Sequence, residues 1–169
     1  MEDQSDHLVN EAFGLLPEGS YLMTAGHGGH RCGLLVSSVQ RCSDGGQLIC
    51  VAAKKGHKID PLIRDSRAFA IGILDPGDKL IQRRFASTDS APVEHRILGV
   101  DDPFDAIETR TLSTGSPILP RCRTWFDCEV LRRVDLESDT ELFVGMVVAV
   151  WHADEEIKVQ RIADPEELD

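Results

Sequence analysis

Short apolar runs, separated by turn residues, are the main pattern along this chain, and they predict strands rather than long helices. Three such runs come early, at residues 21–25, 32–42 and 48–53. Glycine-rich turns separate them, at residues 26–30 and 44–46. Glycine adopts the positive φ angles of tight turns without steric cost. The first third of the chain is therefore predicted to form antiparallel strands joined by tight turns, with Ser37 and Ser38 in the middle of the longest one.

Two longer strands are predicted near the end of the chain. In residues 124–134 apolar and charged side chains alternate, which indicates a strand with one face in the core and one in solvent. Residues 142–151 are apolar at almost every position. Such a strand needs cover on both faces, and in an antiparallel barrel a helix or a second subunit covers the outer face. We therefore predict a homodimer.

The remaining segments contain short helices and a long polar stretch. Helices are predicted at residues 5–16, 61–66 and 78–85, and further strands at 69–74 and 157–162. Asp60 is expected to be the N-cap of the second helix, with Pro61 at its first position. Residues 88–120 are polar and rich in Pro and Gly, which predicts a long excursion with little regular structure.

These elements together predict a mainly β fold with few helices. Short strands and tight turns favour a Greek-key antiparallel barrel over a doubly wound sheet. A chain of 169 residues is expected to form a single domain over residues 1–169. Within it we expect an N-terminal helix in residues 1–16 and a frayed acidic tail at 164–169.

Composition narrows the classes of partner. The formal net charge is −11 and the sequence pI is about 4.9, which argues against a nucleic-acid-binding protein. No apolar run approaches the roughly 20 residues of a membrane-spanning helix, and the acidic N-terminus is unlike a signal peptide. Five cysteines, an odd number without Cys-x-x-Cys spacing, favour reduced thiols in the cytoplasm.

A basic loop stands out in this acidic chain. Lys54, Lys55, His57 and Lys58 surround Gly56, between the strand at 48–53 and the helix at 61–66. Backbone N–H groups, the positive end of a helix and nearby ammonium groups all favour an anion such as a phosphate. A solvated surface loop has the same composition, and the residues alone leave both interpretations open.

Other chemistry is less well supported. The chain has no Gly-x-Gly-x-x-Gly after a strand, no Gly-Lys-Ser/Thr loop and no Gly-x-Ser-x-Gly elbow. His27, His30 and Cys32 are possible metal ligands, but spacing places no fourth ligand beside them. Ser37 or Cys32 lacks the accompanying base of a nucleophile. We therefore predict neither a catalytic side chain nor a metal site.

The order of these features resembles the flavin reductase-like family, whose members have an FMN-binding split barrel. The resemblance covers residues 16–151. The segments that carry it are Leu16-Pro17, Tyr21 to Thr24, Gly33 to Ser38, Lys54-Lys55-Gly56-His57, Leu62 to Ser66, Phe69-Ala70-Ile71, Arg83-Arg84-Phe85, Pro117 to Pro120 and Asp139 to Gly145. The resemblance implies a six-stranded antiparallel split barrel that dimerises, with FMN near the subunit interface.

The resemblance also implies a set of cofactor-binding residues. The strand that carries Gly33, Leu34, Leu35, Ser37 and Ser38 would present backbone N–H groups and two hydroxyls to the flavin ring and ribityl chain. The loop would face the phosphate, through Lys54, Lys55, Gly56, His57 and Lys58. Arg84 is a further cationic candidate.

Three functions follow from this resemblance and from the departures from it. Members often have Asn at the position of Cys32 and Thr at the position of Leu35. Hydroxyl residues are common at the positions of His57 and Ile59. A His often stands at the position of Thr140, where it helps reductases to position substrate. The first hypothesis is an FMN-dependent oxidoreductase that takes hydride from NAD(P)H. The second, favoured by Thr140, is a non-enzymatic flavin-binding or electron-carrier module. The third, favoured by Leu35 and Ile59, is a split barrel that has lost its cofactor.

Overall fold

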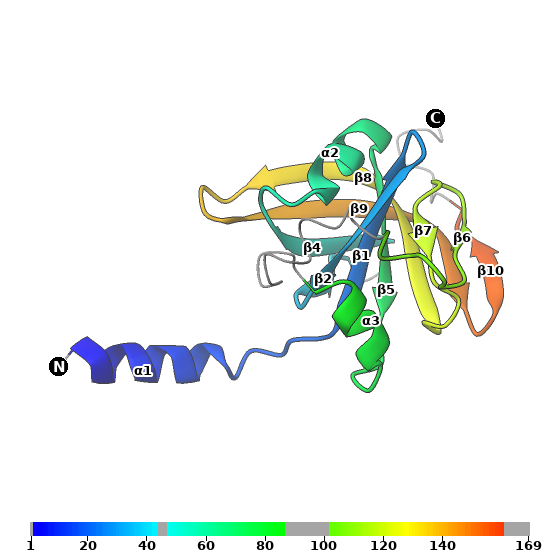
Figure 1. Cartoon of the computed structure of the whole chain (residues 1–169). Helices are drawn as coiled ribbons and strands as arrows, with labels where there is room; N and C mark the ends of the chain where they lie inside the picture. The colour runs from blue at the N-terminus through cyan, green and yellow to red at the C-terminus, as the bar shows by residue number, and fades with distance from the viewer. Residues whose placement is uncertain (1, 44–46, 87–101, 161–169) are drawn as a thin grey trace, which may run out of the picture.

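The computed structural model describes residues 2–43, 47–86 and 102–160, and it is dominated by one curled antiparallel sheet (Figure 1). Neighbouring strands follow the order β2-β1-β5-β8-β9-β4-β3, with β10 added beside β9. The bounds are β1 Tyr21–His27, β2 His30–Val36, β3 Val39–Arg41, β4 Leu48–Lys54, β5 Ala68–Ile73, β8 Thr124–Asp135, β9 Thr140–His152 and β10 Glu155–Lys158. All of these pairings are antiparallel. The mainly β prediction is confirmed.

The sheet curls into the predicted six-stranded barrel because one chain segment pairs on both of its sides. β2 pairs with β1, and β3, which continues β2 after a break at Ser37 and Ser38, pairs with β4. At the break, the Ala52 N–H donates to the Ser38 carbonyl (3.1 Å) and the Gly19 N–H donates to the Ser37 carbonyl (2.9 Å). The strand predicted over residues 32–42 therefore forms in two pieces, one for each edge of the sheet.

Within the described residues, three helices accompany the barrel: α1 at Glu2–Phe13, α2 at Ile59–Ser66 and α3 at Lys79–Arg84. α1 begins and ends about one turn earlier than predicted. α3 has the expected cap, because the Asp78 side chain accepts a hydrogen bond from the Ile81 N–H (3.3 Å). The expectation that Asp60 caps α2 is wrong: Lys58 is the N-cap residue, without a side-chain bond, and Ile59 is the first helical residue. The helix thus begins two residues earlier than predicted, and Ile59 is buried with Ile63 in the core.

Buried side chains form two clusters, one that includes residues of α2 and one that includes residues of α3. The first lies inside the barrel, where α2 contributes Ile59 and Ile63 to a core with Phe69 and Phe143. The second lies under α3 and the following excursion, around Trp125, Phe85 and Phe104. Because β2 alternates between them, its residues connect the barrel interior to α3.

The excursion is anchored to the barrel by buried side chains such as Phe104, Ile118 and Leu119 in the second cluster, and by hydrogen bonds. It contains two short strands, β6 at Arg110–Thr111 and β7 at Pro117–Ile118, which pair with each other. The N–H and hydroxyl of Thr114 both donate to the buried Asp127 carboxylate on β8. Residues 88–101 of the predicted excursion and the predicted tail at 164–169 lie outside the described residues.

The helices and the cysteines of the chain bear on membrane insertion and on disulfide formation. In the described part of the chain, no helix is long and apolar enough to cross a membrane. All five cysteines are free thiols, with Cys122 and Cys128 buried. Burial raises the pKa of the Cys122 thiol to about 11, so this group stays protonated and unreactive at neutral pH.

Candidate anion-binding hollow

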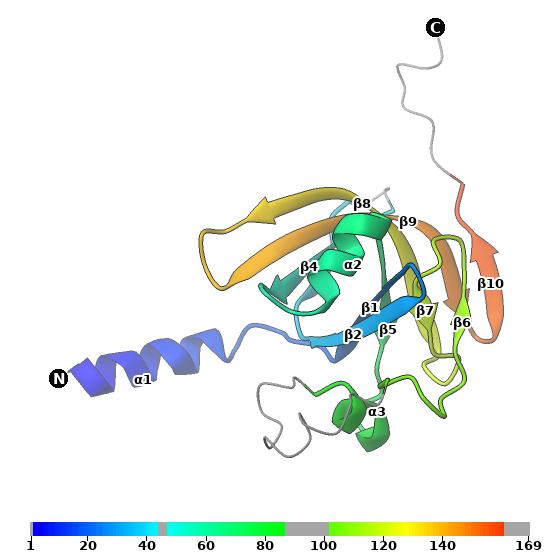
Figure 2. The ribbon, with the colours of Figure 1, turned by 45° about the horizontal axis from the view of Figure 1, so that its top comes forward.

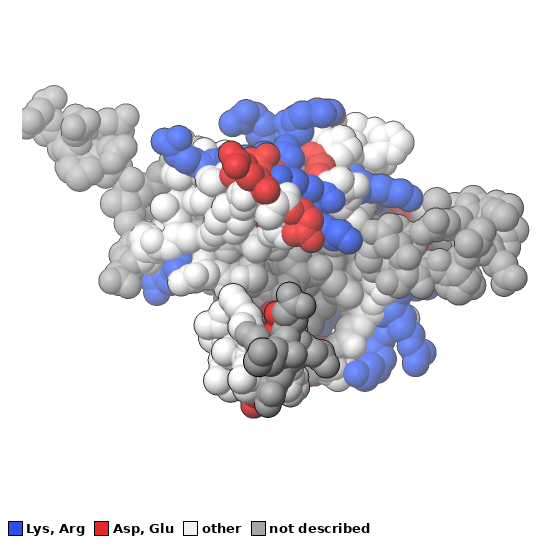
Figure 3. Space-filling view, turned by 90° about the vertical axis from the view of Figure 1, so that its left-hand side faces the viewer, with Lys and Arg blue, Asp and Glu red and all other residues white. Residues whose placement is uncertain are grey.

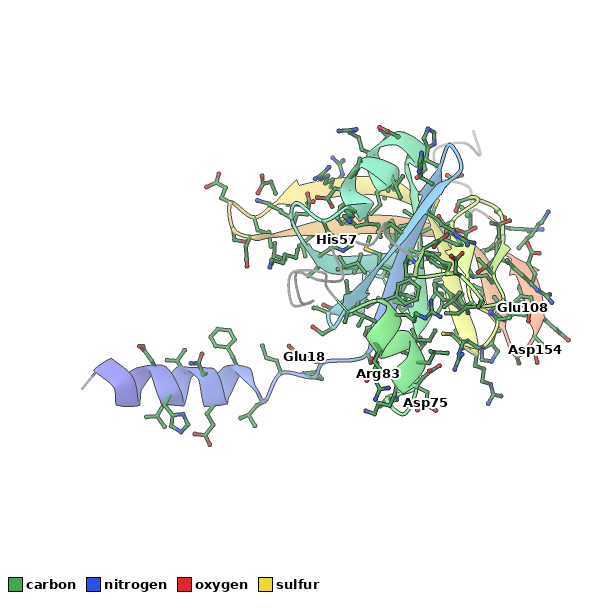
Figure 4. All side chains as sticks on the ribbon, viewed as in Figure 1. Glu18, His57, Asp75, Arg83, Glu108 and Asp154 are labelled. Carbon is green, nitrogen blue, oxygen red and sulfur yellow. The ribbon has the colours of Figure 1, made fainter. Side chains whose placement is uncertain are left out.

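A hollow of about 340 Å³ lies between β2, the start of α2 and the end of α3. Its volume is at the small end of the range for ligand pockets. The residues that line it are His30, Arg31, Cys32, Gly33, His57, Lys58, Leu62, Arg84, Phe85, Ala86 and Pro103. Figure 4 shows His57 at the centre of the molecule, beside the start of α2. Four of the predicted cofactor-binding residues meet here: Gly33, His57, Lys58 and Arg84.

Positive charge is the common property of the polar side chains in this hollow. Arg31, Lys58 and Arg84 are cations, and His30 and His57 add two imidazoles. Among the described residues that line the hollow there is no Asp or Glu. In a chain of net charge −11, this arrangement makes the hollow a local attractor for an anionic ligand.

Arg31 is held in place by its neighbours. Its Nε donates to Asp102 Oδ2 at 2.7 Å, and its guanidinium carbon lies 5.0 Å from the centre of the Phe104 ring. Asp102 therefore neutralises part of the Arg31 charge and also fixes its position. Lys58 and Arg84 are exposed side chains at the rim of the hollow.

The wall formed by β2 owes its shape to Gly33. A Cβ at Gly33 would lie 2.6 Å from two carbons of the Phe85 ring, which is closer than side-chain atoms approach. The ring of Phe85 therefore packs directly on the Gly33 backbone. Cys32, the preceding residue, also lines the hollow, and burial raises the pKa of its thiol even though the nearby Lys58 opposes this. The thiol form is consequently the one that faces a ligand at neutral pH.

The basic loop is divided between two roles. Lys58 and His57 reach the hollow, whereas the Lys55 ammonium pairs with Asp135 on β8. The Lys55 N–H donates to the Asp139 carbonyl at 2.8 Å. Lys54, the last residue of β4, is exposed and pairs with Thr140 of β9. The first two residues of the loop thus attach it to the β8–β9 hairpin, and the last two face the hollow.

Backbone N–H groups at the start of α2 are bonded internally. The Gly56 N–H donates to Asp60 Oδ2 at 2.9 Å, and the Asp60 N–H donates to the His57 carbonyl at 3.0 Å. The Ile59 N–H donates to His57 Nδ1 at 3.2 Å. Burial raises the pKa of the Asp60 carboxyl, against the opposing bond from Gly56. In this conformation the hollow attracts an anion with side-chain cations rather than with these N–H groups.

The remaining predicted residues lie around the hollow rather than in its wall. Leu34 is buried in the barrel core, and Leu35 packs against the second cluster. Ser37 and Ser38 are exposed at the break between β2 and β3. Gly56 has a φ of +75°, and a Cβ there would meet nothing within 4 Å, so its role is conformational. A role in cofactor binding stays a prediction for all of these residues.

Sequence reasoning left out several wall residues. Arg31, Leu62 and Phe85 come from three separate elements, and His30 and Cys32 had been considered only as metal ligands or a nucleophile. Of these residues, Arg31 had a sequence signal for ligand binding, because it is a lone cation two positions before Gly33. In the part of the chain that the structure describes, no three His, Cys, Asp or Glu side chains gather into a metal site.

A family model for the flavin reductase like domain matches residues 13–160, most of the chain. The chain belongs to the flavin reductase-like family. The predicted resemblance is thereby confirmed, and it extends from the end of α1 through β10. Within this flavin reductase-like chain, the hollow lies where the motifs of the resemblance, at Gly33, His57 and Arg84, come together.

Two kinds of curated relative match the chain. It is 28% identical over 131 residues to diflavin flavoprotein A 1 of Synechocystis, which covers 77% of this chain and 22% of that protein. It is 26% identical over 140 residues to a ferric-chelate reductase (NAD(P)H) of Archaeoglobus fulgidus, covering 82% of this chain and 78% of that protein. The chain thus spans about a fifth of the diflavin flavoproteins but most of the ferric-chelate reductase.

Solved structures share the fold. Component B of nitrilotriacetate monooxygenase from Mycobacterium thermoresistibile superposes with a TM-score of 0.70 at 20% identity, covering 97% of this chain and 92% of that one. The flavin reductase of styrene monooxygenase from Pseudomonas putida gives a TM-score of 0.65 at 20% identity, covering 90% and 97%. At this identity the likeness establishes the split-barrel fold.

Proposed function

We propose that this protein is a flavin-dependent oxidoreductase that takes hydride from NAD(P)H and passes electrons to a flavin or another acceptor. The observation that carries the proposal is the cationic hollow in a member of the flavin reductase-like family. Relatives named FMN reductase (NADH) and ferric-chelate reductase (NAD(P)H) match over 87% and 82% of the chain, and they support the reaction class.

FMN is the flavin we propose. A terminal phosphate carries close to two negative charges, and Lys58, His57 and Arg84 provide the complementary groups at one side of the hollow. In FAD the corresponding phosphate is part of a pyrophosphate, with about one negative charge on each phosphorus, and the attached adenosine makes a bulkier ligand for the same space. The hollow's volume of about 340 Å³ favours the smaller ligand.

The bound flavin would supply the hydride chemistry, and the protein's residues would bind and orient it. Lys58 and Arg84 would hold the phosphate by charge-assisted hydrogen bonds. Gly33 would form the β2 wall beside the ligand together with the Phe85 ring that packs on its backbone. The described residues place no acid or base in the hollow other than the two imidazoles and the Cys32 thiol, which agrees with a reaction in which the cofactor carries the chemistry.

A flavin-holding or electron-carrier module is the second candidate. The diflavin flavoproteins carry a matching segment as about a fifth of their length, so the same fold also occurs within larger proteins. Thr140, where members often have His, lies at the start of β9 and pairs with Lys54, away from the residues that line the hollow.

Two measurements decide between these candidates. Purified protein should bind FMN with a visible flavin spectrum, and it should oxidise NADH in air when free flavin is added. Flavin binding without NADH oxidation would favour the carrier module. If neither FMN nor FAD changes the protein's fluorescence or its melting temperature, the flavin assignment is wrong.

We also propose that the protein is a homodimer in the cytoplasm. β9 alternates along its length between buried inner residues and half-exposed apolar outer residues. The outer face continues onto β4, where Leu48 pairs with Met146 and Ala52 pairs with Leu142. Free thiols throughout the chain support a reducing compartment.

A further inference from the structure

Helix α1 extends away from the barrel instead of packing on it. Figures 1 and 2 show it projecting from the molecule at the end of a linker, and Figure 4 places Glu18 in that linker. Its apolar side chains are exposed: Leu8 at 59% and Phe13 at 67%. The family match begins at residue 13, so the helix is an addition in front of the flavin reductase-like domain.

An isolated helix of this length is marginal in water, because packing rather than propensity stabilises most protein helices. α1 nevertheless has a coherent apolar side. At 100° per residue, Leu8, Val9, Ala12 and Phe13 fall within one stripe of the helix. The helix is therefore amphipathic, as helices that pack against an apolar surface are. In this structure its apolar stripe does not pack on its own barrel.

The chain carries one sheet face that such a helix fits. The outer face of β4 and β9 presents half-exposed apolar side chains in adjacent rows: Leu48, Cys50, Ala52, Leu142, Val144 and Met146. Inward-facing neighbours on the same strands, such as Val51 and Phe143, are buried. A contiguous apolar surface of this kind usually marks an interaction site.

Charge favours the same pairing. α1 contains Glu2, Asp3, Asp6 and Glu11 and has no Lys or Arg. On β8, Arg132 pairs with Val144 and Glu129 pairs with Met146, and Lys54 ends the β4 row. The outer face therefore has cations at its Leu142 end and a carboxylate at its Met146 end. Figure 3, which looks toward the side from which α1 leaves, shows Lys and Arg side chains together with Asp and Glu side chains along the upper part of the molecule.

We propose that α1 is an exchanged arm: in the homodimer, α1 of each copy packs its apolar stripe on the outer face of β4 and β9 of the other copy. Two-fold symmetry then covers both helices and both sheet faces with identical contacts. The inference rests on the proposed homodimer, but it does not depend on flavin chemistry.

The test uses the full chain with a photo-crosslinker, p-benzoylphenylalanine, in place of Val9. Irradiation should give a covalent dimer on a denaturing gel, and peptide mapping should join the arm to a peptide containing residues 142–148. The same crosslinker at His7, on the opposite side of the helix, is the matched control and should give little dimer. Crosslinks within a single chain would show that the arm folds back on its own barrel, and the proposal would be wrong.

A second experiment separates the exchange of α1 from dimerisation itself. Replacing Leu8 and Phe13 by Asp should raise the dimer dissociation constant about 100-fold or more in sedimentation experiments, because two buried apolar anchors are lost. A double variant that dimerises as tightly as the parent would overturn the arm and leave the homodimer standing. A parent chain that is monomeric at micromolar concentration would overturn both.

Discussion

Lys55 and Lys58 are three positions apart in one basic loop, yet the fold gives them different partners. Lys55 pairs with Asp135 on the β8–β9 hairpin, whereas Lys58 lies at the rim of the hollow. The sequence indicates that side chains leaving a strand alternate in direction, but it does not show which of them faces a ligand. That assignment depends on where β8 and β9 lie, and these strands come some 80 residues later.

We expect Lys58→Met to weaken FMN binding about tenfold or more, because it removes a charge-assisted phosphate contact and keeps the side-chain stem. Lys55→Met is the matched control and should change FMN affinity little. Fluorescence titration at low and high salt measures both, and the parent's affinity should fall as salt screens the hollow. Equal loss in the two variants would mean that the loop acts through its net charge and not through the hollow.

Gly33 shows a second consequence that emerges only in three dimensions. The sequence marks it as a strand glycine near a turn, whereas in the structure the Phe85 ring occupies the space of a side chain.

We expect Gly33→Ala to destabilise the fold by about 1–3 kcal/mol, the usual cost of overpacking a core. Adding Phe85→Leu should recover part of this loss, since the smaller side chain makes room for the methyl group. Urea unfolding of the two single variants and the double variant gives the coupling. Strictly additive losses would show that the two residues do not share this contact.

At the scale of elements, local pattern predicted the strands well and the helix starts less well. Alternation placed β8 correctly, because side-chain direction in a strand follows directly from position, and a run that is apolar at almost every position placed β9. The start of α2 was misplaced because Asp60 looks like an N-cap, but its carboxylate instead accepts from the Gly56 N–H. A polar side chain between a turn and a helix can bond either way, and local sequence does not show which group it accepts from.

The excursion after α3 is attached to the barrel by a buried polar contact that no local pattern reveals. Asp127 is fully buried on β8 and accepts bonds from the N–H and hydroxyl of Thr114. Burial raises the pKa of the Asp127 carboxyl, and the bonds from Thr114 oppose that rise. A raised folded-state pKa means that stability from this group is greatest below its unfolded value near 3.8 and is lost as pH rises through the folded value.

We therefore expect Thr114→Val to cost about 2 kcal/mol at neutral pH, where it leaves an ionised buried carboxylate with one donor fewer. This loss of stability should shrink as pH falls toward 4, because the Asp127 carboxyl of the variant then binds a proton and no longer carries a buried charge. Thr109→Val, which removes a hydroxyl bonded only to the nearby Ile107 carbonyl, is the control. Unfolding measured from pH 4 to 8 should show a pH-dependent gap for Thr114→Val alone.

At the scale of the whole molecule, the sequence predicted the barrel because six strands of the right pattern have few ways to close. It also predicted which strand would remain uncovered, since β9 is apolar on both faces and one chain has only one barrel interior. It did not predict the hollow as a set of residues. β2, α2 and α3 each supply part of the wall, and only closure of the sheet brings them together.

The outer face of the barrel gives the last prediction. Met146 lies in the apolar row of β9, opposite Leu48 at the start of β4. Met146→Arg should leave the barrel folded, because the side chain points away from the core, but it should place a charge in the proposed dimer interface, where an unpaired charge costs several kcal/mol once buried. We expect a folded monomer by sedimentation velocity at concentrations where the parent is a dimer. Leu80→Arg on α3 is the matched control, since Leu80 is also an exposed apolar residue, at 44%, but lies on another element. If Met146→Arg remains as dimeric as Leu80→Arg, the outer face of β9 is not the interface, and the apolar pattern of that strand needs another partner.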